Sequence, residues 1–80
     1  MKARVFITLK TGVLDPQGKA IEGALAALGF QGIAAVRQGK VFDLDLAEAD
    51  PTKAKAALAA MAEKLLANTV IETYEVAVDK

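Results

Sequence analysis

Apolar and polar residues alternate along three stretches of the chain, at residues 2–10, 40–46 and 70–78. In the first stretch, one face collects the apolar side chains of Ala3, Val5, Ile7 and Leu9. In the second stretch, one face collects Phe42, Leu44 and Leu46, while the other carries Val41, Asp43 and Asp45. A period of two is typical of a strand with one buried face and one wet face. The pattern therefore predicts three half-buried strands.

Two other stretches have apolar residues at helical spacing, and each begins with Asp followed by Pro. The first runs from Asp15-Pro16 to Gly29, and its apolar stripe is Ile21, Ala24, Leu25 and Leu28. The second runs from Asp50-Pro51 to residue 67, where Asn68 is expected to close it in a left-handed conformation. Asp is a favoured N-cap, and Pro is tolerated at the first helical position. We therefore predict two helices.

A short apolar run, Ile33–Arg37, reads as a further strand, and Gln38-Gly39 reads as a hairpin turn into residues 40–46. The element order is then βαββαβ. With right-handed crossovers, both helices of such a chain pack on the same side of the sheet. We predict one domain, residues 1–80, of the α+β class: a ferredoxin-like two-layer sandwich with a four-stranded sheet and two helices on one face.

Apolar residues also occur on strand faces that the helices would not cover. If Phe42 and its neighbours meet the helices, Val41 lies on the open face of the sheet. A chain of 80 residues without Cys has only a marginal core, and association is the usual remedy. We therefore predict a homodimer or homotetramer formed through the open sheet face, with an interface drawn from Phe6, Val41, Tyr74, Val76 and Val78.

Composition narrows the possible functions. The chain has no Cys and no His, which removes cysteine nucleophiles, Cys-type zinc sites and the commonest general base. Ten basic residues balance ten acidic ones, whereas a nucleic-acid binder normally carries a basic excess. No apolar run approaches the roughly 18–20 residues that a membrane span needs. We expect a cytoplasmic protein that binds neither nucleic acid nor membrane.

The stretch Gly12…Gly18-Lys19 resembles a phosphate-binding loop only in part. Such a loop needs free backbone N–H groups at the helix start, whereas here Asp15 would occupy that position and Pro16 lacks an N–H. Ala20 stands where a magnesium-binding Ser or Thr would be. We interpret the stretch as a strand-to-helix turn, and we expect no catalytic, cofactor-binding or metal-binding residue on this chain.

Asp43 and Asp45 point to the same side of a strand, so a metal site is one reading and a solvated face is the other. The solvated face is favoured, with Lys2, Arg4, Arg37 and Lys40 as candidate cross-strand partners.

The run LK-GVLDPQGKAI…LGF closely resembles the PurS family, the small subunits of phosphoribosylformylglycinamidine synthase. The likeness continues through Val36-Arg37, Gly39-Lys40 and LLANTVIETYEV, and so spans nearly the whole chain. Thr69 departs from the family pattern, which commonly has Pro after the Asn.

The resemblance implies a non-catalytic accessory subunit in de novo purine biosynthesis. A large synthetase subunit would bind ATP, Mg²⁺ and substrate, and a glutaminase subunit would release ammonia. The chain would be a dimer that bridges the two and supports ammonia transfer. The resemblance and the exposed turn together single out six partner-contact candidates, Gly12, Asp15, Gln17, Lys19, Arg37 and Lys40.

Other functions are weaker readings of the same residues. The main alternative is a small-molecule-sensing βαββαβ module with a ligand near Gly12–Asp15. An RNA-binding sheet needs adjacent aromatic residues that this chain lacks. A stand-alone enzyme would depend on Asp43, Asp45 and Tyr74 alone.

Overall fold

The computed structural model describes residues 1–79 and contains a three-stranded antiparallel sheet with strand order β2-β1-β3. The elements in chain order are β1 (Lys2–Leu9), α1 (Pro16–Ala27), β2 (Gly39–Asp45), α2 (Pro51–Met61), a π-helical turn η1 (Ala62–Leu66) and β3 (Glu72–Val78). The central strand β1 pairs with both neighbours, so that Val5 lies opposite Phe42 on one side and Val76 on the other. The class predicted from the sequence, α+β, is confirmed.

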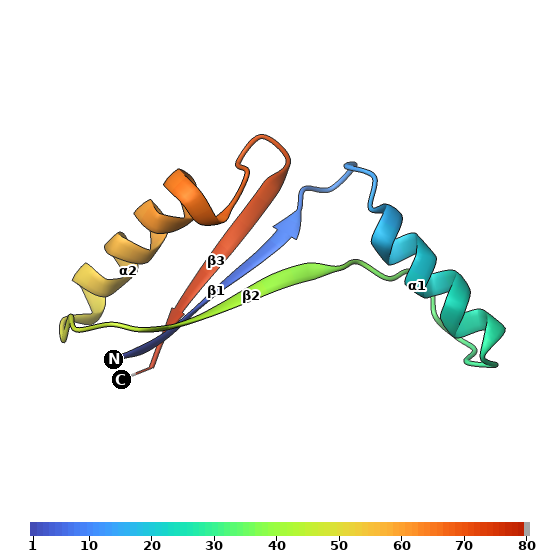
Figure 1. Ribbon diagram of the computed structural model, residues 1–80, viewed down its shortest axis with the longest axis horizontal. Helices are drawn as coiled ribbons and strands as arrows, with labels where there is room; N and C mark the ends of the chain where they lie inside the picture. The colour runs from blue at the N-terminus through green and yellow to red at the C-terminus, as the bar shows by residue number, and fades with distance from the viewer. Residues whose placement is uncertain (80) are drawn as a thin grey trace.

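One face of the sheet is covered by α2 and η1, and the core lies between these two layers (Figure 1). Alternate residues of β1 are buried, as its pattern predicts. They meet fully buried Leu58 and Ala62 from the helical layer. Because α2 lies nearer to β3 than to β2, the inward side chains of β2 are only half-buried.

Both helices begin where the Asp-Pro signals place them. Asp15 accepts a hydrogen bond from the Gly18 N–H at 2.9 Å, and Asp50 accepts one from the Thr52 N–H at 2.9 Å. Gly29 follows α1 with φ of 95°, the left-handed conformation that ends many helices. Asn68 does not adopt that conformation, so this detail of the prediction is wrong. Its side chain instead accepts from the Val70 N–H at 3.2 Å.

The predicted fourth strand is wrong for the single chain. Residues 33–37 belong to no sheet, and Gln38-Gly39 is no hairpin, because β2 starts at Gly39 and the residues before it lie away from the sheet. A strand needs a neighbouring strand for its hydrogen bonds, and among residues 1–79 this segment has none within reach.

The prediction that both helices pack on the sheet is also wrong. Figure 1 shows α1 beyond the ends of the strands, on the opposite side of the molecule from α2. We call residues 12–38, which comprise α1 and the segment that returns from it, the arm. The molecule measures 47 × 26 × 15 Å, and its radius of gyration is 15.8 Å. A compact domain of this length has a radius of gyration of about 12 Å. The chain is therefore a small sheet domain with a projecting arm.

Candidate functional site at the junction of sheet and arm

Two backbone segments connect the sheet to the arm: residues 9–15 lead out from β1, and residues 37–40 lead back into the start of β2. We call this region the junction. The six predicted partner contacts lie at the junction or on the first turns of α1; they are Gly12, Asp15, Gln17, Lys19, Arg37 and Lys40. The structure gathers them at one place, and whether they touch a partner stays a prediction.

Asp15 ties the two segments together. Its side chain is almost fully buried, at 6% exposure. One carboxylate oxygen accepts from the Gly18 N–H at 2.9 Å, and the other accepts from the Gln38 N–H at 2.8 Å. These backbone donors, first Gly18 and then Gln38, hold the pKa of Asp15 below its ordinary value, with a further contribution from the nearby Arg37 charge. The carboxylate occupies the place that a phosphate would need at this helix start.

Arg37, on the returning segment, binds the outgoing segment. Its guanidinium donates to the carbonyl oxygens of Val13 and Lys10, both at 3.1 Å, and to that of Leu9 at 3.4 Å. It therefore holds the outgoing segment from the returning one. Asp15 takes up backbone donors and Arg37 takes up backbone acceptors, so the pair fixes how the arm leaves the sheet.

Gly18 allows α1 and the returning segment of the arm to lie close together. It is the one buried residue of α1, and a Cβ there would lie 2.7 Å from the Asp15 carboxylate and nearer still to the Val36 carbonyl oxygen. The signal in the sequence was a glycine inside the first turns of a helix, three residues after its Asp cap. From the sequence alone, this glycine is interpreted only as part of a possible phosphate loop.

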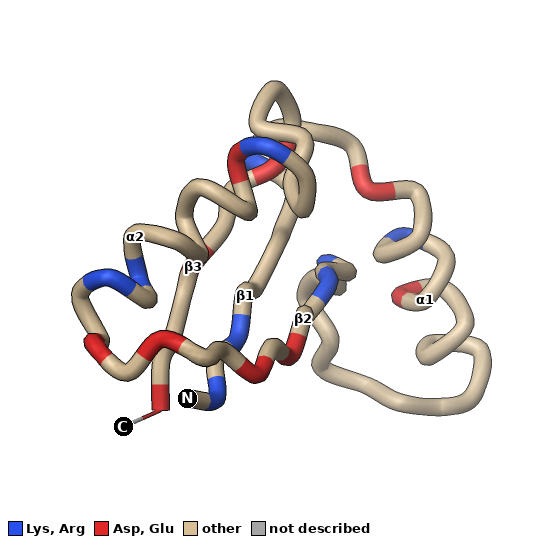
Figure 2. The backbone as a smooth tube through the Cα atoms, turned by 60° about the vertical axis from the view of Figure 1, so that its left-hand side comes forward, with Lys and Arg blue, Asp and Glu red and all other residues tan. Residues whose placement is uncertain are grey.

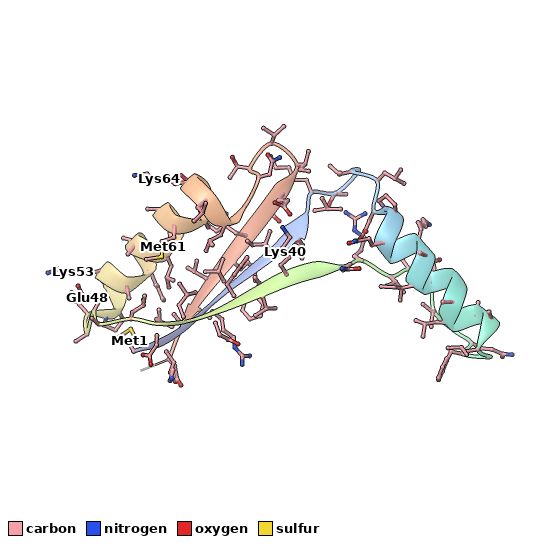
Figure 3. All side chains as sticks on the ribbon, viewed as in Figure 1. Met1, Lys40, Glu48, Lys53, Met61 and Lys64 are labelled. Atoms are coloured by element: carbon pink, nitrogen blue, oxygen red, sulfur yellow. The ribbon has the colours of Figure 1, made fainter. Side chains whose placement is uncertain are left out.

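Lys40 lies on the sheet side of the junction (Figure 3), 3.8 Å from a carboxylate oxygen of Glu72. Glu72 is mostly buried and also accepts from the Asn68 N–H at 2.6 Å. The sequence reading missed Glu72 as a junction residue, because its proximity depends on the pairing of β3 with β1. A cavity of about 130 Å³ lies here, bounded by Asp15, Lys40 and Glu72 among others.

The remaining candidates at the junction are exposed. Gly12 sits in the outgoing turn with φ of 90°, a conformation that favours glycine. Gln17 and Lys19 lie on the outer surface of α1, and the Lys19 ammonium is 3.6 Å from the Glu22 carboxylate. These side chains are free to meet another protein, whereas Asp15 and Arg37 are engaged within the chain.

The predicted oligomer interface divides between the two faces of the sheet. Phe6 and Val41 are register partners on the open face, with 38% and 55% exposure. Tyr74, Val76 and Val78 instead pack on the core side, facing the helical layer. Placing these three on the open face was wrong, because the pairing of Val76 with buried Val5 fixes the parity of β3.

Tyr74, on the core side of β3, forms a hydrogen bond with the helical layer. Its hydroxyl donates to a Glu63 carboxylate oxygen at 2.7 Å. This hydrogen bond, together with desolvation, raises the pKa of Tyr74 above its ordinary value. The residue links β3 to η1 and is not poised as an acid or base.

The two acidic residues of β2 form ion pairs on the open face. Arg4 lies 2.6 Å from Asp43, and Lys2 lies 3.1 Å from Asp45. The Lys2 ammonium, through its hydrogen bond, lowers the pKa of Asp45. Two of the four predicted cross-strand partners are therefore confirmed, while Arg37 and Lys40 lie at the junction. Residues 1–79 contain no cluster of three acidic, His or Cys side chains placed to hold a metal. Nor does any helix in that range have the length and apolarity to cross a membrane.

Comparison with known proteins assigns the chain to a family. The model of the PurS family, described as phosphoribosylformylglycinamidine (FGAM) synthase, matches residues 2–80. The FGAM synthase subunit PurS of Mycobacterium leprae is 51% identical over 75 residues, which cover 94% of this chain and 91% of that protein. The PurS subunit of Methanocaldococcus jannaschii is 43% identical over 79 residues, covering 99% of this chain and 95% of that one.

Solved structures agree with this assignment. The crystal structure of M. jannaschii PurS, a subunit of formylglycinamide ribonucleotide amidotransferase in purine biosynthesis, superposes with a TM-score of 0.89 at 44% identity, covering 99% of this chain and 95% of that one. A chain in the PurLQS structure from Thermotoga maritima gives a TM-score of 0.86 at 30% identity, covering 95% and 93%. The chain therefore belongs to the PurS family, whose members are subunits of FGAM synthase in purine biosynthesis.

Proposed function

We propose that this chain is the non-catalytic accessory subunit of FGAM synthase, bridging the large synthetase subunit and the glutaminase subunit. In that role it supports transfer of glutamine-derived ammonia, while ATP and Mg²⁺ act on the larger subunit. The observation that carries the proposal is the likeness over almost the whole chain to a chain of the T. maritima PurLQS structure. We place the assembly in the cytoplasm.

The junction chemistry supports an architectural role. The buried carboxylate of Asp15 accepts two backbone N–H groups, and the guanidinium of Arg37 donates to three carbonyls. A catalytic group needs its reactive atoms free to meet substrate. Both charged groups are instead used to hold the backbone in one shape.

The shape offers two separate surfaces to larger partners. The exposed side chains of Gln17, Lys19 and Lys40 lie at the junction or on the first turns of α1. On α2 and η1, Lys53 and Lys64 project away from the sheet at the other end of the molecule (Figure 3). A subunit that bridges two proteins can use two separate surfaces, and the chain, 47 Å along its longest axis, is elongated enough to present both. Exposed charged groups of this kind mainly set encounter rate and register.

We further propose that the chain works as a homodimer or homotetramer, in which the open sheet face with Phe6 and Val41 is a contact surface. An exposed aromatic side chain beside an exposed branched one, with the Arg4–Asp43 ion pair on the same face, supports this proposal, since interface cores are enriched in aromatic residues and their rims are polar.

The alternative function, a small-molecule-sensing module, has less support. Its ligand site would lie near Gly12–Asp15, and the cavity that Asp15 borders measures about 130 Å³. Pockets for small organic ligands usually measure about 300–1,000 Å³. A thermal-shift screen with amino acids and nucleotides tests it, since the accessory-subunit role predicts no shift with any of them.

The bridging role is tested by mixing this chain with its cognate synthetase and glutaminase subunits and measuring the mass of the assembly by light scattering. We expect all three to co-elute when the chain, substrate and glutamine are present, and the synthetase and glutaminase to separate when the chain is omitted. A stable synthetase–glutaminase pair without the chain would overturn the bridging role.

A further inference from the structure

The charged groups at the junction are sorted by depth, with acidic groups inside and basic groups at the surface. Asp15 is 6% exposed, and the side chain of neighbouring Glu72 is 13% exposed. By contrast, the side chain of Lys40 is 61% exposed, and Lys10 and Arg37 are exposed as well. A protein that touches the junction from outside therefore meets cations and not carboxylates.

The two buried carboxylates are also occupied by backbone donors. Asp15 accepts from the N–H groups of Gly18 and Gln38 at 2.9 and 2.8 Å, and Glu72 accepts from the Asn68 N–H at 2.6 Å. Turning either carboxylate outward would leave backbone N–H groups without a partner, which is costly where they are buried. The acidic groups therefore stay inside when another protein approaches.

The surface cations have weaker attachments. The Lys10 ammonium forms no ion pair within the described residues, and Arg37 binds neutral carbonyl oxygens of the outgoing segment. Arg carries five N–H donors, and Arg37 makes three hydrogen bonds. Lys40 is 3.8 Å from a Glu72 oxygen, a contact that contributes little at an exposed position. Positive charge and hydrogen-bond donors are thus left for an outside acceptor.

The opposite end of the sheet is arranged differently. In Figure 2, acidic residues gather near the two termini, where Asp43 and Asp45 of β2 lie. These carboxylates are 72% and 69% exposed and pair with exposed Arg4 and Lys2, so that charges of both signs are neighbours at the surface. Exposed charge of a single sign is therefore a feature of the junction and not of the whole molecule.

We propose that the exposed cations of the junction, Lys10, Arg37 and Lys40, dock on a surface rich in Asp and Glu on one of the larger FGAM synthase subunits. The inference rests on the proposed bridging role and adds the chemistry of the partner's surface. Complementary charge of this kind speeds encounter and fixes register. Lys10 and Lys40 supply long-range attraction, and Arg37 supplies directed donors from a backbone-anchored position.

Other occupants fit the junction less well. A second copy related by a two-fold axis through this surface would place cations opposite the same cations. A nucleic-acid binder normally carries a basic excess, whereas ten acidic residues balance the ten basic ones of this chain. A nucleotide would need more room than the cavity of about 130 Å³ that Asp15 and Lys40 border. An acidic protein surface needs neither a deep pocket nor a basic excess.

Charge reversal at the junction tests the proposal. Labelled chain is titrated into the cognate synthetase and glutaminase subunits together, with substrate and glutamine present, at salt concentrations of about 0.05 and 0.3 M. Lys10→Glu/Lys40→Glu should raise the dissociation constant of the chain at least tenfold at the lower salt. The wild-type dissociation constant should rise with salt more steeply than that of the variant, because screening weakens an attraction that the variant has lost.

A matched control makes the same change in net charge away from the junction. Lys2 and Lys55 are exposed, on β1 near the N-terminus and on α2, and Lys2→Glu/Lys55→Glu should leave the dissociation constant within about threefold of wild type. The single variant Lys10→Glu breaks no ion pair of the described residues and should still weaken binding at least threefold. It separates lost docking from any disturbance of Glu72 by the change at Lys40.

Four results would overturn the proposal. If the junction variant binds as tightly as wild type, the docking surface lies elsewhere, while the bridging role stands. Equal weakening by the junction and control variants would show a response to net charge alone. If the wild-type chain binds neither subunit, the bridging role fails and the proposal with it. If the junction variant binds the subunits normally but loses binding to single-stranded RNA, nucleic acid is the occupant.

Discussion

Replacing Gly18 by Ala should destabilise the arm, whereas the same replacement at Gly23 should stabilise it. Both glycines lie in α1, and in a helix interior Ala is favoured over Gly by about 1 kcal/mol. The difference between the two sites is therefore the surroundings of the added methyl group.

The structure sets the size of that difference. At Gly18, a Cβ would lie 2.7 Å from an Asp15 carboxylate oxygen and nearer still to the Val36 backbone carbonyl, which cannot swing away. Overpacking of this kind costs about 1–3 kcal/mol, so the net loss should be up to about 2 kcal/mol after the helix-propensity gain. At Gly23, no atom lies within 4 Å of the added Cβ, so the gain of about 0.5–1 kcal/mol remains.

The assay is native-state hydrogen exchange of the α1 amides, supported by urea unfolding of the whole chain. Amide protection in α1 reports opening of the arm even if the sheet stays folded. Gly18→Ala should lower protection and Gly23→Ala should raise it. If both variants raise protection to a similar degree, the close approach of α1 to Val36 does not exist in solution and the description of the junction is wrong.

Three further predictions follow from the core and from two shifted pKa values. Leu58→Ala removes a fully buried side chain between α2 and the sheet and should lower the free energy of unfolding by about 2–5 kcal/mol in urea titrations, whereas Leu65→Ala, at an exposed site, should change it by less than about 0.5 kcal/mol. Backbone hydrogen bonds lower the pKa of Asp15 in the folded state. Its contribution to stability is therefore present above the unfolded pKa of about 3.9 and is lost as pH falls through the lower folded pKa. Hydrogen-exchange protection of the α1 amides should decrease over this pH range, and the decrease should be smaller in Asp15→Asn. The hydrogen bond to Glu63 raises the pKa of Tyr74, the single tyrosine, so ultraviolet titration should give a midpoint above 10 that drops in Glu63→Gln; an unchanged midpoint would refute the contact.

Local sequence patterns predicted most of the helices and strands, because these elements are set by residues close together in the sequence. The alternation in β1 gave the buried face with Ala3, Val5 and Ile7. The Asp-Pro pairs located both helix starts, because an N-cap interaction involves residues only two or three positions apart. The rejection of the phosphate loop rested on the same short-range geometry.

Contacts between segments far apart in the sequence were harder to predict from the sequence alone. The short apolar run at residues 33–37 indicates a segment that suits a strand, but it does not say where a neighbouring strand would come from. The register of β3 against β1 decided that Tyr74 faces the core, and no feature within residues 70–78 carries that information. Arg37 was identified as a residue of interest, yet its three carbonyl partners come from a segment more than 20 positions earlier in the chain.

The accessory role can be tested most directly by the nitrogen source that the assembled enzyme uses. Cognate synthetase and glutaminase subunits are supplied with formylglycinamide ribonucleotide, ATP and Mg²⁺, and amidine formation is followed with glutamine or with ammonium, in the presence and absence of this chain. The account predicts that glutamine-dependent turnover requires the chain while ammonium-dependent turnover persists without it. Equal glutamine-dependent turnover with and without the chain would contradict the account.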